Sequence, residues 1–193
     1  MTKQTRFFEE DSMPDKETGI ELLIAKDIAE VVANMVRIYC VKIEEVGSLR
    51  REKPVVNDID FVVLTNDLYW QKIKDIMVSA NAKLVCAGNK ILRVLKPEYY
   101  GDKEVLVQID FYRATEETYG ITKLIRTGSE EHNIWLAKEA IKKGMRLLYS
   151  KGLVKDGEVI AGKDEKEVFE ALGLEYIVPP EREVVNGKSV WMK

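Results

Sequence analysis

Apolar residues in the first part of the chain recur with two periods, the alternation of a strand and the three-to-four spacing of a helix. Helix-like spacing covers 17–39 and 67–79. The first of these helices is expected to face the core through Ile20, Leu23, Ile24, Ile28, Val31, Met35 and Ile38. Strand-like runs cover 41–46, 58–64, 82–87, 90–96 and 104–112.

The pattern changes near residue 115, where a boundary between two domains is predicted. Helices are expected at 116–126 and 130–143, separated by a Thr-Gly-Ser break, and Ser129 is suited to cap the second helix. Shorter segments follow in the order strand, strand, strand, helix, at 146–149, 152–155, 158–160 and 164–173.

Two carboxylates stand at the start of a strand that otherwise has a buried pattern. Asp58 and Asp60 flank Ile59, and because side chains alternate between the faces of a strand, both carboxylates point to the same face. Asp110 lies near the end of the run 104–112, on the face opposite its apolar residues. If these strands are neighbours, three carboxylates meet at one sheet surface, which is costly unless a cation binds them. Hard divalent ions such as Mg²⁺ prefer such oxygen ligands.

The turn before this strand carries groups suited to binding phosphate. Gly47 permits close backbone approach, Ser48 can donate a hydrogen bond, and an arginine of the pair Arg50-Arg51 can clamp phosphate oxygens. Each feature is common by itself, as an ordinary turn or a solvated surface pair. Their order along the chain is more specific. It favours phosphoryl transfer in which one divalent ion activates a hydroxyl and a second holds the triphosphate.

Composition narrows the class of protein without identifying a partner. The 193 residues are 46% apolar and 33% charged, as in globular proteins with a sizeable core, and the net charge of −3 gives no overall positive field. One histidine and no CxxC motif argue against structural zinc, and Cys40 and Cys86 are expected to be buried thiols. No apolar run approaches the roughly 20 residues of a membrane helix and no signal-peptide pattern is present, so a cytoplasmic location is expected.

The combined motifs resemble a known family. The order of Gly47-Ser48-Leu49-Arg50-Arg51 and Asp58-Ile59-Asp60 is similar to the nucleotidyltransferase superfamily signature. The second half of the chain resembles the thumb of family X DNA polymerases, at Thr127-Gly128-Ser129, His132-Asn133, 160–162 and 168–183. The resemblance implies an α+β fold that contains only a palm and a thumb. This minimal form of the family is similar in plan to its small viral member. Its parts would be an N-terminal arm at 1–19, a palm of mixed sheet with helices on one face at 20–115, and a small α/β thumb at 116–193.

The function that the resemblance implies is DNA-directed DNA synthesis. Deoxynucleotides would be added to a primer 3′-OH on gapped or primer-template DNA, filling short gaps during repair. Two Mg²⁺ ions, replaceable by Mn²⁺, would be held by Asp58 and Asp60, with Asp110 serving mainly the ion at the nucleophile. The nucleoside triphosphate would be bound by Gly47, Ser48, Arg51, Arg126, Thr127, Gly128 and Asn133.

The chain also departs from the family pattern. The short N-terminal arm leaves no room for the lyase and DNA-binding fingers domains, so a protein partner could supply extra grip on DNA. Ile125-Arg126 replaces an aromatic or Gly-Trp pair, and Ala137 stands at or near a template-contacting arginine. Gln108 and Tyr112 flank Asp110, where family members often carry arginines.

Alternatives therefore stay open beside the polymerase interpretation. One is a template-independent or RNA-acting nucleotidyltransferase, and another is a non-catalytic nucleic-acid-binding remnant. Basic residues that could contact DNA phosphates, or could equally form a solvated surface, are Lys90, Arg93, Lys138, Lys142 and Lys143.

Overall fold

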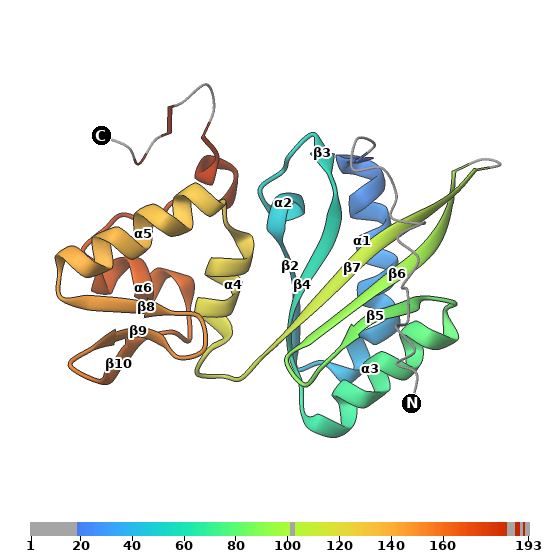
Figure 1. The fold of residues 1–193 in the computed structure, drawn as a ribbon, viewed down its shortest axis with the longest axis horizontal. Helices are drawn as coiled ribbons and strands as arrows, with labels where there is room; N and C mark the ends of the chain where they lie inside the picture. The colour runs from blue at the N-terminus through green and yellow to red at the C-terminus, as the bar shows by residue number, and fades with distance from the viewer. Residues whose placement is uncertain (1–18, 101–102, 185–187, 190, 192–193) are drawn as a thin grey trace, which may run out of the picture.

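The computed structural model describes residues 19–100, 103–184, 188–189 and 191. The predicted N-terminal arm lies outside these residues apart from Gly19. The described chain forms two lobes, each a sheet packed against helices (Figure 1). The mixed α+β composition predicted from the sequence is confirmed.

The first lobe is built on a five-stranded mixed sheet with the strand order β2-β4-β7-β6-β5. Only the β4–β7 pair within this sheet is parallel. The strands are β2 (Lys42–Val46), β4 (Asp58–Leu64), β5 (Lys83–Ala87), β6 (Ile91–Tyr100) and β7 (Lys103–Ala114). The helices α1 (Leu22–Val36) and α3 (Asp67–Ser79) cover one face, as Figure 1 shows, and enclose the larger hydrophobic core with it. On the opposite face, Val46, Val62, Leu64 and Tyr112 pack in a small separate cluster with Tyr119 of the second lobe.

Shorter elements complete the first lobe. The two-residue strands β1 (Ile20–Glu21) and β3 (Val55–Val56) pair with each other. A 3₁₀ turn, η1 (Arg37–Tyr39), follows α1, and the one-turn helix α2 (Gly47–Arg50) lies between β2 and β3. The stretch predicted as a Gly-Ser turn is therefore the beginning of a helix.

The core face of α1 differs from the prediction. Leu23, Val31 and Ile38 of the predicted stripe are largely exposed. Ile28 is buried as predicted, and Ile20, Ile24 and Met35 are partly buried against the core. The other buried residues of α1 were not predicted: Ala25, Ala29, Val32, Ala33 and Val36. The helix carries two apolar stripes, and the alanines at every fourth position belong to the stripe that joins the larger hydrophobic core. Alanine side chains weigh little in a hydropathy pattern, so the buried face was only partly predicted.

The prediction for the cysteines is wrong at one of the two positions. Cys86 is exposed, because it lies on β5 at the edge of the sheet, where all five residues are exposed. Cys40 is half-buried, and its Sγ donates a hydrogen bond to the carbonyl of Val36 at 3.3 Å. Both are free thiols.

The second lobe has its own core, formed by residues from Ile121 onward. Its elements are α4 (Tyr119–Thr127), α5 (Glu130–Lys142), β8 (Met145–Leu148), β9 (Gly152–Lys155), β10 (Glu158–Ala161), α6 (Glu165–Ala171) and η2 (Pro179–Arg182). The three strands form an antiparallel sheet. Ser129 caps α5 as predicted, since its side chain accepts a hydrogen bond from the backbone N–H of His132. We propose the domain boundary near residue 115, where β7 ends and the second core has not begun.

Polar contacts join the two lobes. Arg50 of α2 donates to both carboxylate oxygens of Glu165, at 2.9 and 2.5 Å, and Arg182 donates to the same carboxylate at 3.0 Å. Arg182 is fully buried and Glu165 is 4% exposed, so this cluster is shielded from water. Lys123 of α4 forms a second ion pair across the lobes, with Glu44 of β2. Within the described chain, no helix is long and apolar enough to cross a membrane.

Candidate active site

Three carboxylates meet where β4 and β7 lie side by side. The parallel register places Asp60 directly beside Asp110, and Asp58 lies two residues earlier on β4, on the same face. One oxygen from each of the three carboxylates lies within 4.8 Å of the other two. Asp110 is fully buried and Asp60 is 9% exposed. The sheet therefore brings these carboxylates together on one surface, as the sequence pattern indicated.

This concentration of negative charge raises the pKa values of the two carboxyl groups on β4. Burial, together with the neighbouring charges of Asp58 and Asp110, raises the pKa of Asp60 to about 7. Burial and the charge of Asp110 also raise the pKa of Asp58. Converging carboxylate oxygens of this kind fit a divalent cation, whose positive charge would relieve their mutual repulsion.

Asp110 is held by two neighbouring side chains. The guanidinium of Arg93 on β6 donates from Nε to Oδ1 at 2.8 Å and from Nη2 to Oδ2 at 2.6 Å. The hydroxyl of Tyr112 donates to Oδ2 at 2.9 Å. Gln108, the other flanking residue, donates to Asp58 at 3.4 Å. Arg93, predicted as a DNA contact, is thus bonded within the carboxylate site.

The helix α2 brings its first residue against the carboxylates. Gly47 has a positive φ of 64°, and a Cβ there would lie 2.1 Å from the Oδ2 atom of Asp60. Only glycine fits, because any side chain would strain the backbone and collide with the carboxylate. The Ser48 Oγ is buried without a hydrogen-bond partner among the described residues. A buried hydroxyl of this kind has free capacity to bind a ligand oxygen.

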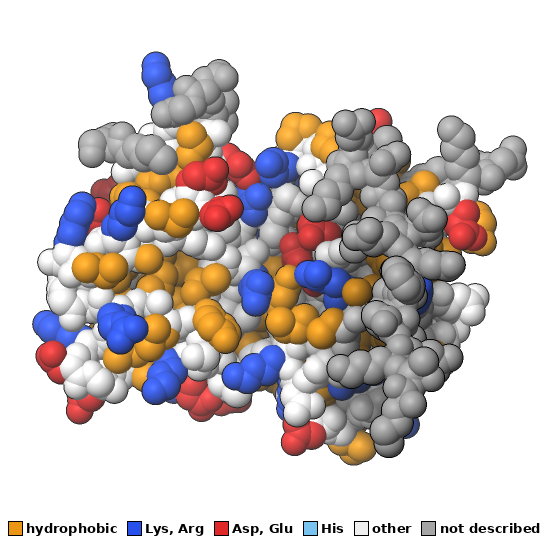
Figure 2. Space-filling view, in the orientation of Figure 1, with side chains coloured by type: hydrophobic (Ala, Val, Ile, Leu, Met, Phe, Trp, Pro, Cys, Tyr) orange, Lys and Arg blue, Asp and Glu red, His pale blue; other side chains and the backbone are white. Residues whose placement is uncertain are grey.

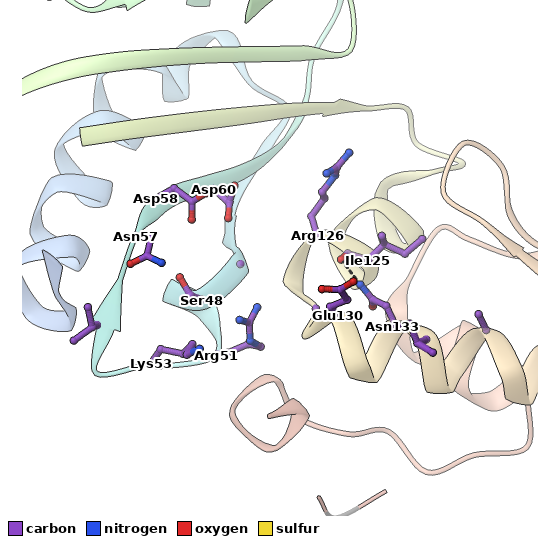
Figure 3. Close-up of a pocket in the computed structure, with 15 residues that line it drawn as sticks. Ser48, Arg51, Lys53, Asn57, Asp58, Asp60, Ile125, Arg126, Glu130 and Asn133 are labelled. Carbon is purple, nitrogen blue, oxygen red and sulfur yellow. Dashed lines mark hydrogen bonds between the residues drawn. The ribbon is translucent and has the colours of Figure 1, made fainter. Parts of the chain in front are cut away.

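A cavity of about 580 Å³ adjoins this surface between the lobes. Six residues predicted to bind nucleotide line it: Gly47, Ser48, Arg51, Arg126, Gly128 and Asn133. In Figure 3, Ser48, Asp58 and Asp60 stand on one side of the cavity, and Arg126 and Asn133 stand on the other. Figure 2 shows the hollow between the lobes, with acidic and basic side chains on its sides. Chain segments that are distant in sequence therefore share one cavity.

The residues of the second lobe that were predicted to bind nucleotide differ in whether they line the cavity. Thr127 is fully buried beside it, where its hydroxyl accepts a hydrogen bond from Arg50 at 2.6 Å. The Nδ2 of Asn133 donates to the carbonyl of Ile125 at 2.8 Å, and its buried Oδ1 has no partner among the described residues. Arg126 stacks on the ring of Tyr112, 3.9 Å from its centroid. Thr127 is thus the one member of the predicted nucleotide-binding set that does not line the cavity.

Arg51 is engaged by the second lobe. Its Nη1 donates to the carbonyl of Thr127, and its Nε donates to the carboxylate of Glu183. Lys53 lies 3.9 Å from the same carboxylate. Glu183 was not predicted as a site residue, and neither were Lys53 and Asn57, which line the cavity. Lys53 and Asn57 could have been found from the sequence, because they are polar residues between Arg51 and Asp58, which were both predicted as site residues.

The predicted basic contacts are scattered. Lys138, Lys142 and Lys143 are exposed on or just after α5 and do not line the 580 Å³ cavity. Lys90 lines a second cavity, of about 700 Å³, between the sheet and α4. The structure therefore does not gather these lysines at the carboxylate site.

Together, the buried carboxylates, the glycine-led helix and the cavity between a lobe with a five-stranded sheet and a smaller lobe match the architecture of the palm-and-thumb class of nucleotidyltransferases. Residues 122–183 match the family model described as DNA polymerase beta thumb. This chain belongs to the family X DNA polymerases. We therefore call the first lobe the palm and the second lobe the thumb.

The chain aligns with two curated relatives over different shares of their lengths. It is 32% identical over 175 residues to "DNA polymerase/3'-5' exonuclease PolX" of Bacillus subtilis, which covers 89% of this chain and 29% of the relative. It is 30% identical over 162 residues to "Repair DNA polymerase X" of African swine fever virus, covering 79% of this chain and 88% of the viral protein. The chain thus spans less than a third of the bacterial relative and most of the viral one.

Proposed function

We propose that this protein is a DNA-directed DNA polymerase that fills short gaps during DNA repair. It would add deoxynucleotides to a primer 3′-OH by two-metal nucleotidyl transfer. The observation that carries the proposal is the convergence of Asp58, Asp60 and Asp110 beside a cavity that palm and thumb share. The palm would comprise 20–115 and the thumb 116–193, and the names of the relatives support synthesis of DNA in repair.

The carboxylates would hold two divalent ions, Mg²⁺ with Mn²⁺ as a substitute. Asp58 and Asp60 would ligate both, and Asp110 would serve mainly the ion at the primer hydroxyl. Bound ions would activate that hydroxyl and neutralise charge on the phosphates. The palm would contribute preorganisation, because its parallel strands β4 and β7 hold the carboxylates in place before the substrate binds.

The triphosphate would lie between α2 and the start of α5. Gly47 lets the start of α2 lie directly against Asp60, and the hydroxyl of Ser48, which has no partner among the described residues, would donate to a phosphate oxygen. Arg51 would bind phosphate oxygens as a fork. On the thumb, Arg126, Thr127, Gly128 and Asn133 would frame the sugar and base. Lys90, Lys138, Lys142 and Lys143 remain proposed DNA contacts, with a protein partner adding grip.

The test is extension of a primer across a one-nucleotide gap in duplex DNA. Wild-type protein with Mg²⁺ should insert the nucleotide that matches the template base, and excess EDTA should stop the reaction. Lys83→Ala, which changes an exposed lysine on the edge strand β5, serves as a control and should leave the rate unchanged. Absence of insertion by the wild type, in Mg²⁺ and in Mn²⁺, would remove the proposal.

A second candidate is a template-independent or RNA-acting nucleotidyltransferase. It is favoured by Ile125 and Arg126, which line the cavity in place of the family's aromatic or Gly-Trp pair. Extension of a single-stranded primer, with ribonucleotides compared against deoxyribonucleotides, separates the two. Extension without a template, or a preference for ribonucleotides, supports this second candidate over the first.

A further inference from the structure

Arg93 occupies a defined position opposite Asp110. The antiparallel register of β6 and β7 pairs the two residues directly, so their side chains stand on the same face of the sheet. The guanidinium forms a fork with the carboxylate, with Nε and Nη2 donating to different oxygens. Among the described residues, Arg93 is the one cation that forms an ion pair with Asp110.

The hydrogen bonds around Asp110 are distributed unevenly. Oδ2 accepts from Arg93 Nη2 at 2.6 Å, from Arg93 Nε at 3.1 Å and from the Tyr112 hydroxyl at 2.9 Å. Oδ1 accepts only from Arg93 Nε at 2.8 Å, within the described chain. Because each carboxylate oxygen has about two lone-pair sites, Oδ1 keeps one free and Oδ2 keeps none. The carboxylate is thereby both fixed in rotation and left with one oxygen available.

The positive charge next to Asp110 comes from the neighbouring strand β6, not from the strand that carries Asp110. The residues that flank Asp110 on its own strand, Gln108 and Tyr112, are uncharged, although the family resemblance leads one to expect arginines there. Arg93 brings a guanidinium to the same carboxylate from the neighbouring strand. It is 40% exposed at its side chain while Asp110 is fully buried, so the arginine spans from the solvent edge to the carboxylate.

We propose that Arg93 is a positioning residue, which with Tyr112 orients the Asp110 carboxylate so that Oδ1 binds the ion at the primer hydroxyl. This inference rests on the proposed function and adds a residue to it. Hydrogen-bonded partners of metal ligands commonly set both the orientation and the affinity of the site. A DNA-phosphate contact, the role expected from the sequence, would instead leave the guanidinium free for the ligand.

Ion binding can be measured without DNA or nucleotide, by titrating Mn²⁺ into the free protein and following it by electron paramagnetic resonance. Arg93→Ala should weaken Mn²⁺ binding by about 10–100-fold. Arg93→Lys should recover part of the loss, because it restores the charge but not the fork. Tyr112→Phe, which retains the ring, should weaken binding by a smaller factor. Arg113→Ala, which breaks an ion pair with the exposed Asp67 in the same lobe, should bind Mn²⁺ as the wild type does.

Gap filling adds a second readout. At saturating Mn²⁺, Arg93→Ala should lower kcat while the KM for gapped DNA stays unchanged. Wild-type Mn²⁺ affinity in both Arg93→Ala and Tyr112→Phe would overturn the proposal, and so would tighter binding, which means that the arginine competes with the ion. A raised KM for DNA with unchanged kcat would make Arg93 a DNA contact and would also overturn it. If the wild type binds Mn²⁺ and the variants lose it, but no protein extends a primer, the proposed function fails and the positioning role stands.

Discussion

Replacing Asp60 with asparagine should stabilise the metal-free protein while abolishing its proposed activity. The physical reason is the buried cluster of three carboxylates, which carries more negative charge than its surroundings can solvate. Burial, with the charges of Asp58 and Asp110, raises the pKa of Asp60 to about 7, from an ordinary value of 3.8. The amide that replaces the carboxylate is uncharged at every pH, so Asp60→Asn removes this cost without changing the size of the side chain.

The magnitude follows from the shift in pKa. Between pH 4 and pH 7 the folded state binds a proton at Asp60 that the unfolded state has released, so the unfolding free energy of the metal-free protein falls as pH rises. A shift of about three units corresponds to about 4 kcal/mol, at roughly 1.4 kcal/mol per unit. This value is an upper bound on the gain in unfolding free energy, because the amide forms no hydrogen bond that the carboxylate lacked. We expect Asp60→Asn to raise the unfolding free energy by about 1–3 kcal/mol at pH 8 in EDTA.

Urea unfolding followed by circular dichroism measures this difference. The gain should be present at pH 8 and should largely disappear at pH 4, where the folded wild type is protonated at this carboxyl and the unfolded chain is close to its own pKa. Excess Mg²⁺ should stabilise the wild type, by about 2.7 kcal/mol at 100 times its Kd, and should have little effect on the variant. Asp75→Asn, at an exposed position on α3, serves as the control and should change little at either pH.

Two results would refute this reasoning. Asp60→Asn could be less stable than the wild type at pH 8 in EDTA, which would mean that the charged carboxylate is well accommodated without an ion. The gain could also be equal at pH 4 and pH 8, which would mean that its origin is not the charge of Asp60. Either outcome removes the electrostatic basis for a cation site at the carboxylates.

Two further variants probe the contacts between palm and thumb. Glu165→Gln leaves the guanidinium groups of Arg50 and Arg182 without their carboxylate in a buried site, and should lower the unfolding free energy by about 3–5 kcal/mol, measured by urea unfolding. Glu183→Gln weakens the ion pair that holds Arg51 in this structure, and should lower the KM for the nucleotide in gap filling because Arg51 is freer to bind phosphate.

The control for Glu165→Gln lies on α5. Glu139→Gln breaks the ion pair with Lys142, whose side chain is 68% exposed, and should cost at most about 1 kcal/mol. An equally small loss in Glu165→Gln would contradict the view that the buried cluster joins the lobes. A KM that rises in Glu183→Gln would show that the carboxylate orients Arg51 for the nucleotide and does not compete for it.

The convergence of the carboxylates could be predicted because it depends on a simple period. Alternation along a strand fixes the shared face of Asp58 and Asp60, and a parallel neighbour is enough to bring Asp110 beside them. Ser129 as a helix cap was predictable for a similar reason, because its partner lies only three residues away. Local spacing therefore predicted the cap and the shared face of Asp58 and Asp60, whereas the place of Asp110 depended on its strand being their neighbour.

The features that sequence reasoning missed depend on contacts between distant segments. The bond between Arg93 and Asp110 follows from the register of β6 on β7, which alternation alone does not determine. Glu183 meets Arg51 across 132 residues, so no local pattern indicates the pair. Part of the buried face of α1 was missed because three of its six buried residues are alanines, which carry little hydrophobicity. The exposure of Cys86 depends on β5 being an edge strand.

The most direct test of the central claim is the rate of single-nucleotide gap filling by Asp110→Ala relative to the wild type. Both proteins would be measured under single-turnover conditions with saturating Mg²⁺, DNA and nucleotide, after circular dichroism has confirmed equal folding. A carboxylate that ligates the ion at the primer hydroxyl predicts a loss of roughly 10³–10⁴-fold in the rate. Extension by Asp110→Ala within about tenfold of the wild type would contradict the account, because the buried carboxylates would not then carry the chemistry.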